Sequence, residues 1–157
     1  MSEQRIVHIE LDRKTLVSRS PEVEHERAAA IYDLLEENHF APVGGFRGPY
    51  RVHLRLEDSN RLVIDINNVD DDRLESLSMS MMPFRRIIRD YFKICESYFD
   101  AIKRLSPSQI ETIDMARRGL HNEGSDFLRE RLEGKAEMDK DTARRLFTLL
   151  CVLHFRG

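Results

Sequence analysis

The hydrophobic pattern of this chain changes its period at Pro83, and this change limits the fold more than any other feature. Before Pro83, apolar and polar residues alternate over short runs, which is the period of a strand with one buried face. After Pro83, apolar residues recur every three to four positions, which is the period of a helix. We therefore predict a single α+β domain over residues 1–157, with residues 1–82 mostly sheet plus one helix and residues 83–157 all helical.

The N-terminal half contains three clearly alternating runs and a weaker fourth, near residues 5–11, 50–57, 61–67 and 75–81. The second and third runs are joined by a short polar turn, which is typical of a β-hairpin. Matching their apolar faces pairs Leu54 with Ile64 and sets His53 opposite Asp65. These runs predict a small, mainly antiparallel sheet of three to four strands, and whether residues 75–81 form the fourth strand stays open.

One helix is predicted within this half. Ser20 followed by Pro21 is a typical helix start, because a hydroxyl can cap the helix and proline suits its first position. The helix should run to about Asn38 and pack on the sheet. The glycine- and proline-rich residues 41–49 then predict a loop.

The second half predicts a layer of helices packed beside the sheet. A long amphipathic helix begins near Pro83, and Ser106 with Gln109 forms the pattern of a capping box for the next one. Residues 107–133 fit one helix or two, because Gly119 and Gly124 each cost about 1 kcal/mol relative to alanine within a helix.

The last helix is apolar almost all round between residues 143 and 153. Such a helix is usually surrounded by protein, so we expect it at the centre of the helical layer or in a homodimer interface. Cys95 and Cys151 lie in apolar helical patterns without the close spacing of metal or redox motifs. We predict that both are buried free thiols.

Charge and termini limit the possible partners. The N-terminus is polar and leads straight into a strand-like run, without a signal-like apolar segment, so we expect a cytoplasmic protein that does not span a membrane. Residues 1–82 carry a net charge of −6 and residues 83–157 of +3. This is far from the basic character of a dedicated nucleic-acid binder. A basic ridge interrupted by acidic residues does exist, consisting of Arg85, Arg86, Arg89 and Lys93 with Arg144 and Arg145.

The run from Ala116 to Ser125 concentrates two guanidiniums, an imidazole and a carboxylate. On a helix, Arg117 and His121 are four residues apart and share a face. Guanidiniums suit phosphate or carboxylate groups, and a histidine can transfer a proton near neutral pH. The candidates are His121 and Glu123 for catalysis, and Arg117, Arg118 and Asn122 for ligand binding. A solvated helix face explains the same pattern without any function.

A second cluster contains Glu22, Glu24, His25 and Glu26 and resembles a site for a hard cation. On a helix Glu22 and Glu26 share a face while Glu24 points elsewhere, and no second set of ligands is evident. We therefore interpret the cluster as a solvated helix start and predict no metal site. The sequence identifies no cofactor.

Several motifs together resemble a bacterial uncharacterised protein family, number 0262 of the UPF series. The residues that carry the resemblance are 20–27 (SPEVEHER), 40–44 (FAPVG), 83–86 (PFRR), 117–124 (RRGLHNEG) and 141–147 (DTARRLF). The resemblance covers nearly the whole chain. It implies a bacterial, cytoplasmic setting and transfers no activity, cofactor or catalytic residue.

Two functional hypotheses follow. The first is a non-enzymatic interaction or regulatory protein with a protein partner or a second copy of itself, because every candidate site lacks a group that catalysis would need. The alternative is a small enzyme or sensor for a phosphorylated or carboxylated metabolite, held by Arg117, Arg118, His121 and Glu123. A cleft containing these four side chains would favour the alternative, and a flat exposed face would exclude it.

Overall fold

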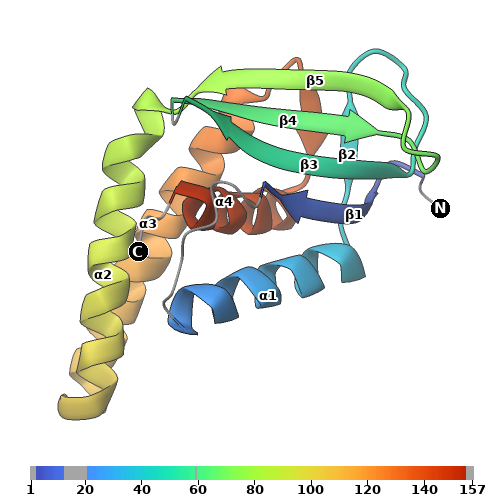
Figure 1. Cartoon of the computed structure of the whole chain (residues 1–157). Coiled ribbons are helices and arrows are strands. Elements are labelled where there is room, and N and C mark those ends of the chain that lie inside the picture. Colours follow the sequence, from blue (N-terminus) through green and yellow to red (C-terminus); the bar gives the residue numbers. More distant parts are fainter. Residues whose placement is uncertain (1–2, 13–20, 59, 155–157) are drawn as a thin grey trace.

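The computed structural model describes residues 3–12, 21–58 and 60–154, and it confirms the α+β class (Figure 1). A four-stranded sheet lies on one side of the molecule, and the helices lie below it and at one end. The predicted Ser20 cap falls outside the described residues, but the helix itself begins at Pro21 as expected.

The main sheet has the strand order β1-β3-β4-β5. Its strands are β1 (Ile6–Leu11), β3 (Tyr50–Glu57), β4 (Arg61–Asn67) and β5 (Arg73–Ser80). β3, β4 and β5 are antiparallel neighbours, whereas β1 pairs with β3 in parallel. The hairpin register is confirmed, with Leu54 opposite Ile64 and His53 opposite Asp65. The fourth strand that the sequence left open is β5.

A second, two-stranded sheet was not predicted. β2 (Phe40–Pro42) pairs antiparallel with β6 (Ala136–Met138). The prediction that residues 83–157 are all helical is therefore wrong at β6, and part of the predicted loop at 41–49 is strand. Three residues are too short to show a period, and this pairing joins segments that are far apart in the sequence.

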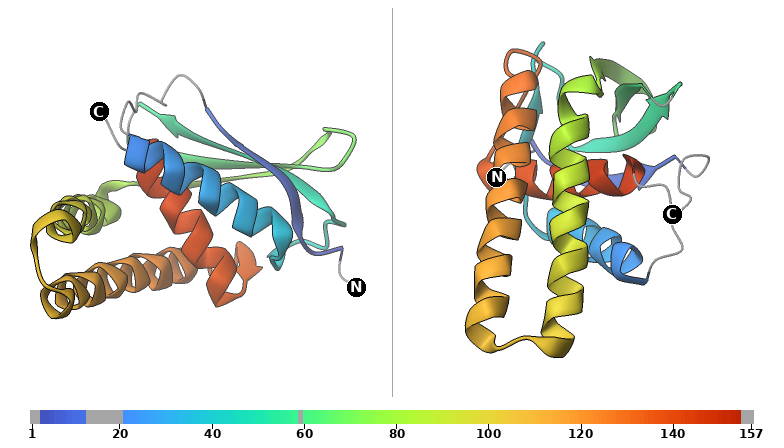
Figure 2. Two further views of the ribbon diagram at one scale, coloured as in Figure 1. Left: turned by 90° about the horizontal axis from the view of Figure 1, so that it is seen from below. Right: turned by 90° about the vertical axis from the view of Figure 1, so that its left-hand side faces the viewer.

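The helices are α1 (Pro21–Glu36), α2 (Arg85–Arg104), α3 (Pro107–Arg131) and α4 (Lys140–His154), and the short 3₁₀ helix η1 (Met82–Phe84) precedes α2. α3 begins with the predicted capping box, in which Ser106 accepts from the Gln109 amide and the Gln109 side chain accepts from the Ser106 amide. It continues through both glycines as one helix. α2 and α3 form a hairpin that extends past the other elements, away from the sheet (Figure 2).

α4 lies at the centre of the molecule, where it contacts α1, α3 and β3. Phe147, Leu149 and Leu153 lie on different sides of this helix and are at most 1% exposed. The apolar side chains around the helix are therefore buried by other elements of the same chain. A single buried cluster joins α4 to the sheet and to the other helices. Cys95 and Cys151 are buried free thiols, as predicted.

Gly124 allows α3 and α4 to pack closely. A Cβ atom at this position would lie 2.1 Å from Cζ of Phe147. Neighbouring side chains on the same two helices are therefore held near one another, and among them are His121, one turn before Gly124 on α3, and Thr148, next to Phe147 on α4. Gly119, by contrast, has open space where a Cβ atom would lie.

Candidate functional site

A pocket of about 330 Å³ opens beside the middle of α3, where α1, α3 and α4 meet over one residue of α2. The four helices contribute side chains of mixed character to its wall. The lining residues are His25, Glu26, Ala29, Ala30 and Asp33 from α1, Tyr91 from α2, Arg117, Arg118 and His121 from α3, and Arg144, Arg145 and Thr148 from α4.

Three of the five residues predicted on α3 lie in this pocket, namely Arg117, Arg118 and His121. Glu123 lies outside the lining, with its side chain 54% exposed and its Oε2 atom 4.0 Å from Nη2 of Arg86 on α2. Asn122 does not line the pocket either, but it contacts a residue that does. Its Oδ1 accepts a 2.6 Å hydrogen bond from Nη1 of Arg144. The predicted cluster is therefore divided by the helix period, with Glu123 separated from the other charged groups.

The four arginines of the pocket differ in how their charge is balanced. The carboxylate of Asp114 forms ion pairs with two of them. Its Oδ1 lies 2.6 Å from Nη2 of Arg117, and its Oδ2 lies 3.0 Å from Nε of Arg118. Arg144 is positioned by the neutral amide of Asn122. Across the described ranges, no carboxylate lies within 4.0 Å of Arg144 or Arg145. The α4 side of the pocket therefore carries two cations without an ion-pair partner there.

His121 lies at the base of the pocket. Its Nε2 is 2.7 Å from Oγ1 of Thr148, and its ring packs edge-on against Tyr91 and Phe147, each with a centroid distance of 5.3 Å. Burial, together with the nearby charges of Arg144 and Arg117, lowers the pKa of His121 to about 4. At neutral pH the imidazole is uncharged and can accept or donate a hydrogen bond.

Glu26 lines the same pocket from α1. The buried Tyr91 hydroxyl donates a 3.1 Å hydrogen bond to Oε1 of Glu26. Burial raises the pKa of Glu26, and it does so against the opposing effects of Tyr91, Arg117 and His25. The carboxyl group therefore holds its proton to a higher pH than an exposed glutamate. A pair of titratable groups with pKa values shifted by their surroundings is typical of functional sites.

Sequence reasoning missed the residues that other helices bring to the pocket. Arg144 and Arg145 were interpreted as part of a basic ridge, and His25 and Glu26 as a solvated helix start. The sequence showed that these four residues are polar and lie in helices. Nothing in the local pattern indicated that α1 and α4 converge on α3.

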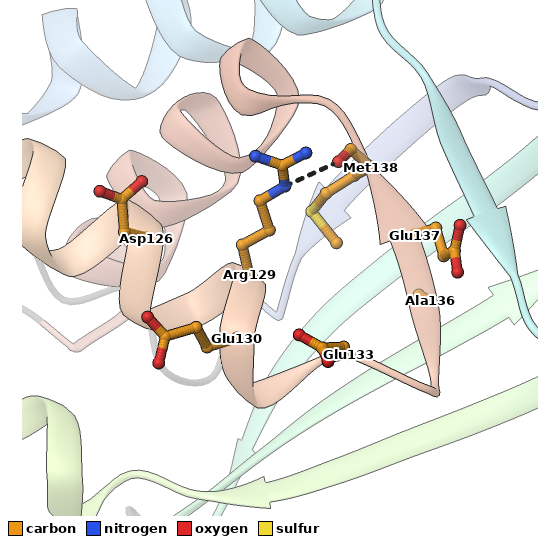
Figure 3. Close-up of a pocket in the computed structure, with 7 residues that line it drawn as sticks. All are labelled: Asp126, Arg129, Glu130, Glu133, Ala136, Glu137 and Met138. Carbon is orange, nitrogen blue, oxygen red and sulfur yellow. Dashed lines mark hydrogen bonds between the residues drawn. The ribbon is translucent and has the colours of Figure 1, made fainter.

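A second concavity of about 480 Å³ lies between the end of α3 and β6 (Figure 3). Its rim carries four carboxylates, from Asp126, Glu130, Glu133 and Glu137, and these point in different directions. The single cation, Arg129, already donates a 3.0 Å hydrogen bond to the Met138 carbonyl. Within the ranges that the structure describes, no group of three or more His, Cys, Asp or Glu residues is arranged to hold a metal ion. We therefore place the candidate site at the arginine-lined pocket.

In the described part of the chain, no helix is both long enough and apolar enough to cross a bilayer. This agrees with the charged character of the two long helices α2 and α3.

Comparisons with known proteins place the chain in a family. The UPF0262 protein of Ruegeria pomeroyi is 60% identical over 162 residues and covers 100% of both chains. The UPF0262 protein of Paramagnetospirillum magneticum is 60% identical over 154 residues, with 98% of each chain covered. The UPF0262 protein of Erythrobacter litoralis is 55% identical over 161 residues and again covers 100% of both. No solved structure matches the chain. The profile of the bacterial "Uncharacterised protein family (UPF0262)" matches residues 3–156, and the chain therefore belongs to this family.

Proposed function

We propose that this protein is a non-enzymatic regulatory protein that binds a small phosphorylated or carboxylated metabolite in the pocket between α1, α3 and α4. The observation that carries the proposal is the position of Arg144 and Arg145, which line the pocket without a carboxylate partner among the described residues. Guanidiniums bind phosphate and carboxylate groups through paired hydrogen bonds, so an anion would supply the missing partner.

The electrostatics of the pocket support an anionic ligand. Its wall carries four arginines against the carboxyl groups of Glu26 and Asp33, and burial favours the neutral form of Glu26. The pocket is therefore positive overall. Water is partly excluded there, and a charge-assisted hydrogen bond is stronger in such a setting than on an open surface.

The neutral side chains give the pocket a means of selecting its ligand. His121 is uncharged near pH 7 and is fixed by Thr148, and the Glu26 carboxyl is fixed by Tyr91. Such fixed polar groups discriminate between ligands, because a ligand that fails to satisfy them leaves them unpaired. A sensor needs this combination of charge attraction and fixed polar contacts.

The enzymatic alternative is favoured by one observation, the opposite shifts of the pKa values of Glu26 and His121. A carboxyl whose pKa is raised and an imidazole whose pKa is lowered can serve as acid and base. If the pocket is catalytic, incubating a bacterial metabolite extract with the protein should change an anionic compound. A Glu26→Gln variant should prevent that change, and mass spectrometry measures both. An unchanged extract supports the regulatory function.

The proposed regulatory function also includes a place in the cell and a partner molecule. We propose that the protein acts in the bacterial cytoplasm and transmits ligand binding to a partner protein or to a second copy of itself. α1 is the element that ligand binding would move, because it forms one wall of the pocket and rests on α4 and β1. Light scattering with and without bound anion would show whether the second copy is the partner.

Isothermal titration calorimetry with methyl phosphate and malonate tests the binding function at constant ionic strength. An Arg144→Gln, Arg145→Gln double variant should bind at least about tenfold more weakly, because a hydrogen bond to a charged group contributes about 1.5–3 kcal/mol. The matched control is an Arg86→Gln, Arg89→Gln variant, which removes two exposed cations of α2 outside the pocket. Equal loss in both variants, or no binding by the wild type, would contradict the proposal.

A further inference from the structure

A second hollow of about 410 Å³ adjoins the arginine-lined pocket. The two share His25, Glu26 and Arg117 in their walls, so they lie side by side along α1 and the α2–α3 hairpin, and together they are called the groove. The far part of the groove reaches the start of α1 and is lined on the hairpin side by Tyr98 and Phe99.

The two parts of the groove differ in chemistry. Tyr98 and Phe99 are half-buried, and their rings pack edge to face with a centroid distance of 5.9 Å. The guanidinium carbon of Arg117 lies 4.7 Å from the centre of the Tyr98 ring. Flat apolar groups bind to such surfaces, because aromatic rings stack on one another and on the face of a guanidinium.

Charge separates the two parts as well. Arg118, Arg144 and Arg145 line the first pocket and are absent from the walls of the second, whereas the second gains Glu22 beside the shared Glu26. A second anionic group would be repelled there. The groove therefore suits a ligand with its negative charge at one end only.

The helix geometry gives the spacing of the two hollows along α2, and so the approximate size of a ligand that occupies both. Tyr91 lines the first pocket and Tyr98 the second, and they are seven residues apart on α2. At 1.5 Å per residue, this separation is about 10 Å along the helix axis. One phosphate or carboxylate group joined directly, or by a few atoms, to an aromatic ring has this length.

We propose that the ligand is an aromatic metabolite with a single anionic head group, with its phosphate or carboxylate held by Arg118, Arg144 and Arg145 and its ring held against Tyr98, Phe99 and the Arg117 guanidinium. This inference rests on the proposed anion-binding function and adds the chemical class of the group that carries the anion. Arg117 belongs to both parts and joins them.

Paired probes with the same head group test the inference. Phenyl phosphate should bind the wild type about tenfold more tightly than methyl phosphate, since its ring buries apolar area and stacks on the aromatic side chains. Phenylacetate and acetate repeat the comparison for a carboxylate and show which head group the pocket prefers. Calorimetry measures all four at one ionic strength.

Two substitutions test where the ring binds. A Tyr98→Leu, Phe99→Leu variant keeps apolar side chains at both positions and removes the rings, so it should lose the preference for phenyl phosphate while methyl phosphate binds as before. Ile102→Ala is the control, because Ile102 is 51% exposed on the same helix and outside the groove. Circular dichroism confirms that each variant is folded.

The possible results separate the two proposals. Equal affinity of the wild type for phenyl and methyl phosphate would overturn the aromatic class and leave the anion site in place. No affinity for any probe would overturn both. A preference that persists in the Tyr98→Leu, Phe99→Leu variant would overturn the placement of the ring. If that variant does not fold, nuclear Overhauser contacts between phenyl phosphate and the Tyr98 and Phe99 rings of the wild type decide the placement.

Discussion

Single side chains in the pocket are kept in unusual protonation states by burial. His121 is the clearest case, because its pKa lies near 4 in the folded protein and its ordinary value is 6.5. Between these values the unfolded chain binds a proton that the folded chain does not bind. The free energy of unfolding must therefore fall as the pH falls through this window.

The His121→Asn variant isolates this contribution. From pH 6.5 to pH 4, the wild type should lose up to about 3 kcal/mol more stability than the variant, at about 1.4 kcal/mol for each unit of pKa shift. Urea unfolding at several pH values measures the difference. Glu26 acts in the opposite direction, because its raised pKa favours the folded state at low pH and the benefit is lost as the pH rises. Glu26 is present in both the wild type and the His121→Asn variant, so the difference between their stabilities cancels most of its contribution.

The control for this prediction is His8→Gln on β1, whose side chain is 40% exposed and lies outside the pocket. It should leave the wild-type pH profile nearly unchanged. An identical pH profile for the wild type and His121→Asn would show that His121 is not held neutral by burial.

The order of residues along α3 explains how far the site could be predicted. Arg117, Arg118 and His121 lie within five positions of one helix, so the helix period alone indicated that they could act together. The same period places Glu123 on another side, which the sequence prediction did not take into account. Arg144 and Arg145 reach the pocket only because α4 crosses α3, and such a crossing is a property of the tertiary fold.

Among the elements, α3 contains two glycines with opposite roles. A Cβ atom at Gly119 has open space around it, so Gly119→Ala should stabilise the protein by about 0.5–1 kcal/mol through its higher helix propensity. A Cβ atom at Gly124 would overlap the Phe147 ring, so Gly124→Ala should destabilise the protein by about 1–3 kcal/mol. Chemical denaturation of the two variants measures both changes.

The two glycine variants act as controls for each other, because both make the same chemical change in one helix. Equal changes in stability would mean that α3 and α4 are not packed as closely as the contact between Gly124 and Phe147 requires. The result also bears on the pocket, since the same packing brings His121 to Thr148.

The end of α1 is joined to the sheet by one amide side chain. Oδ1 of Asn38 accepts from the Ile6 amide at 2.7 Å, and its Nδ2 donates to the Ile6 and Leu34 carbonyls at 2.9 and 2.7 Å. An Asn38→Ala variant should lose about 1–3 kcal/mol of stability, because it leaves buried backbone groups unpaired. It should also speed hydrogen exchange of the Ile6 amide. Unchanged exchange at Ile6 would contradict this role.

Which elements the sequence predicted depended on their length. β3, β4 and α2 contain enough residues for a period to appear, and all three were expected close to their observed bounds. For α3, the sequence left open whether residues 107–133 form one helix or two. β2 and β6 have three residues each and were missed. The parallel pairing of β1 with β3 also lay beyond local reasoning, because it depends on how the chain returns to the sheet after α1, which separates the two strands in the sequence.

At the scale of the whole molecule, the sheet and the central helix α4 form a frame, and the functional candidate lies on the helical side of it. α1 lies below the sheet and the α2–α3 hairpin lies at one end of the molecule (Figure 1). Both contribute side chains to the wall of the pocket. The pocket is therefore a product of the assembled fold, and a change in the angle between α1 and the hairpin would change its shape. This arrangement suits a protein that reports ligand binding through the position of a helix.

The most direct test of an anion site at this pocket is nuclear magnetic resonance of the arginine side chains during a titration with methyl phosphate. The Nε–H signals of Arg118, Arg144 and Arg145 should shift together and reach saturation. Those of Arg51 and Arg61 on the sheet, outside the pocket, should stay in place. Unsaturated shifts spread over all of these arginines, or no shift in the pocket, would contradict the account.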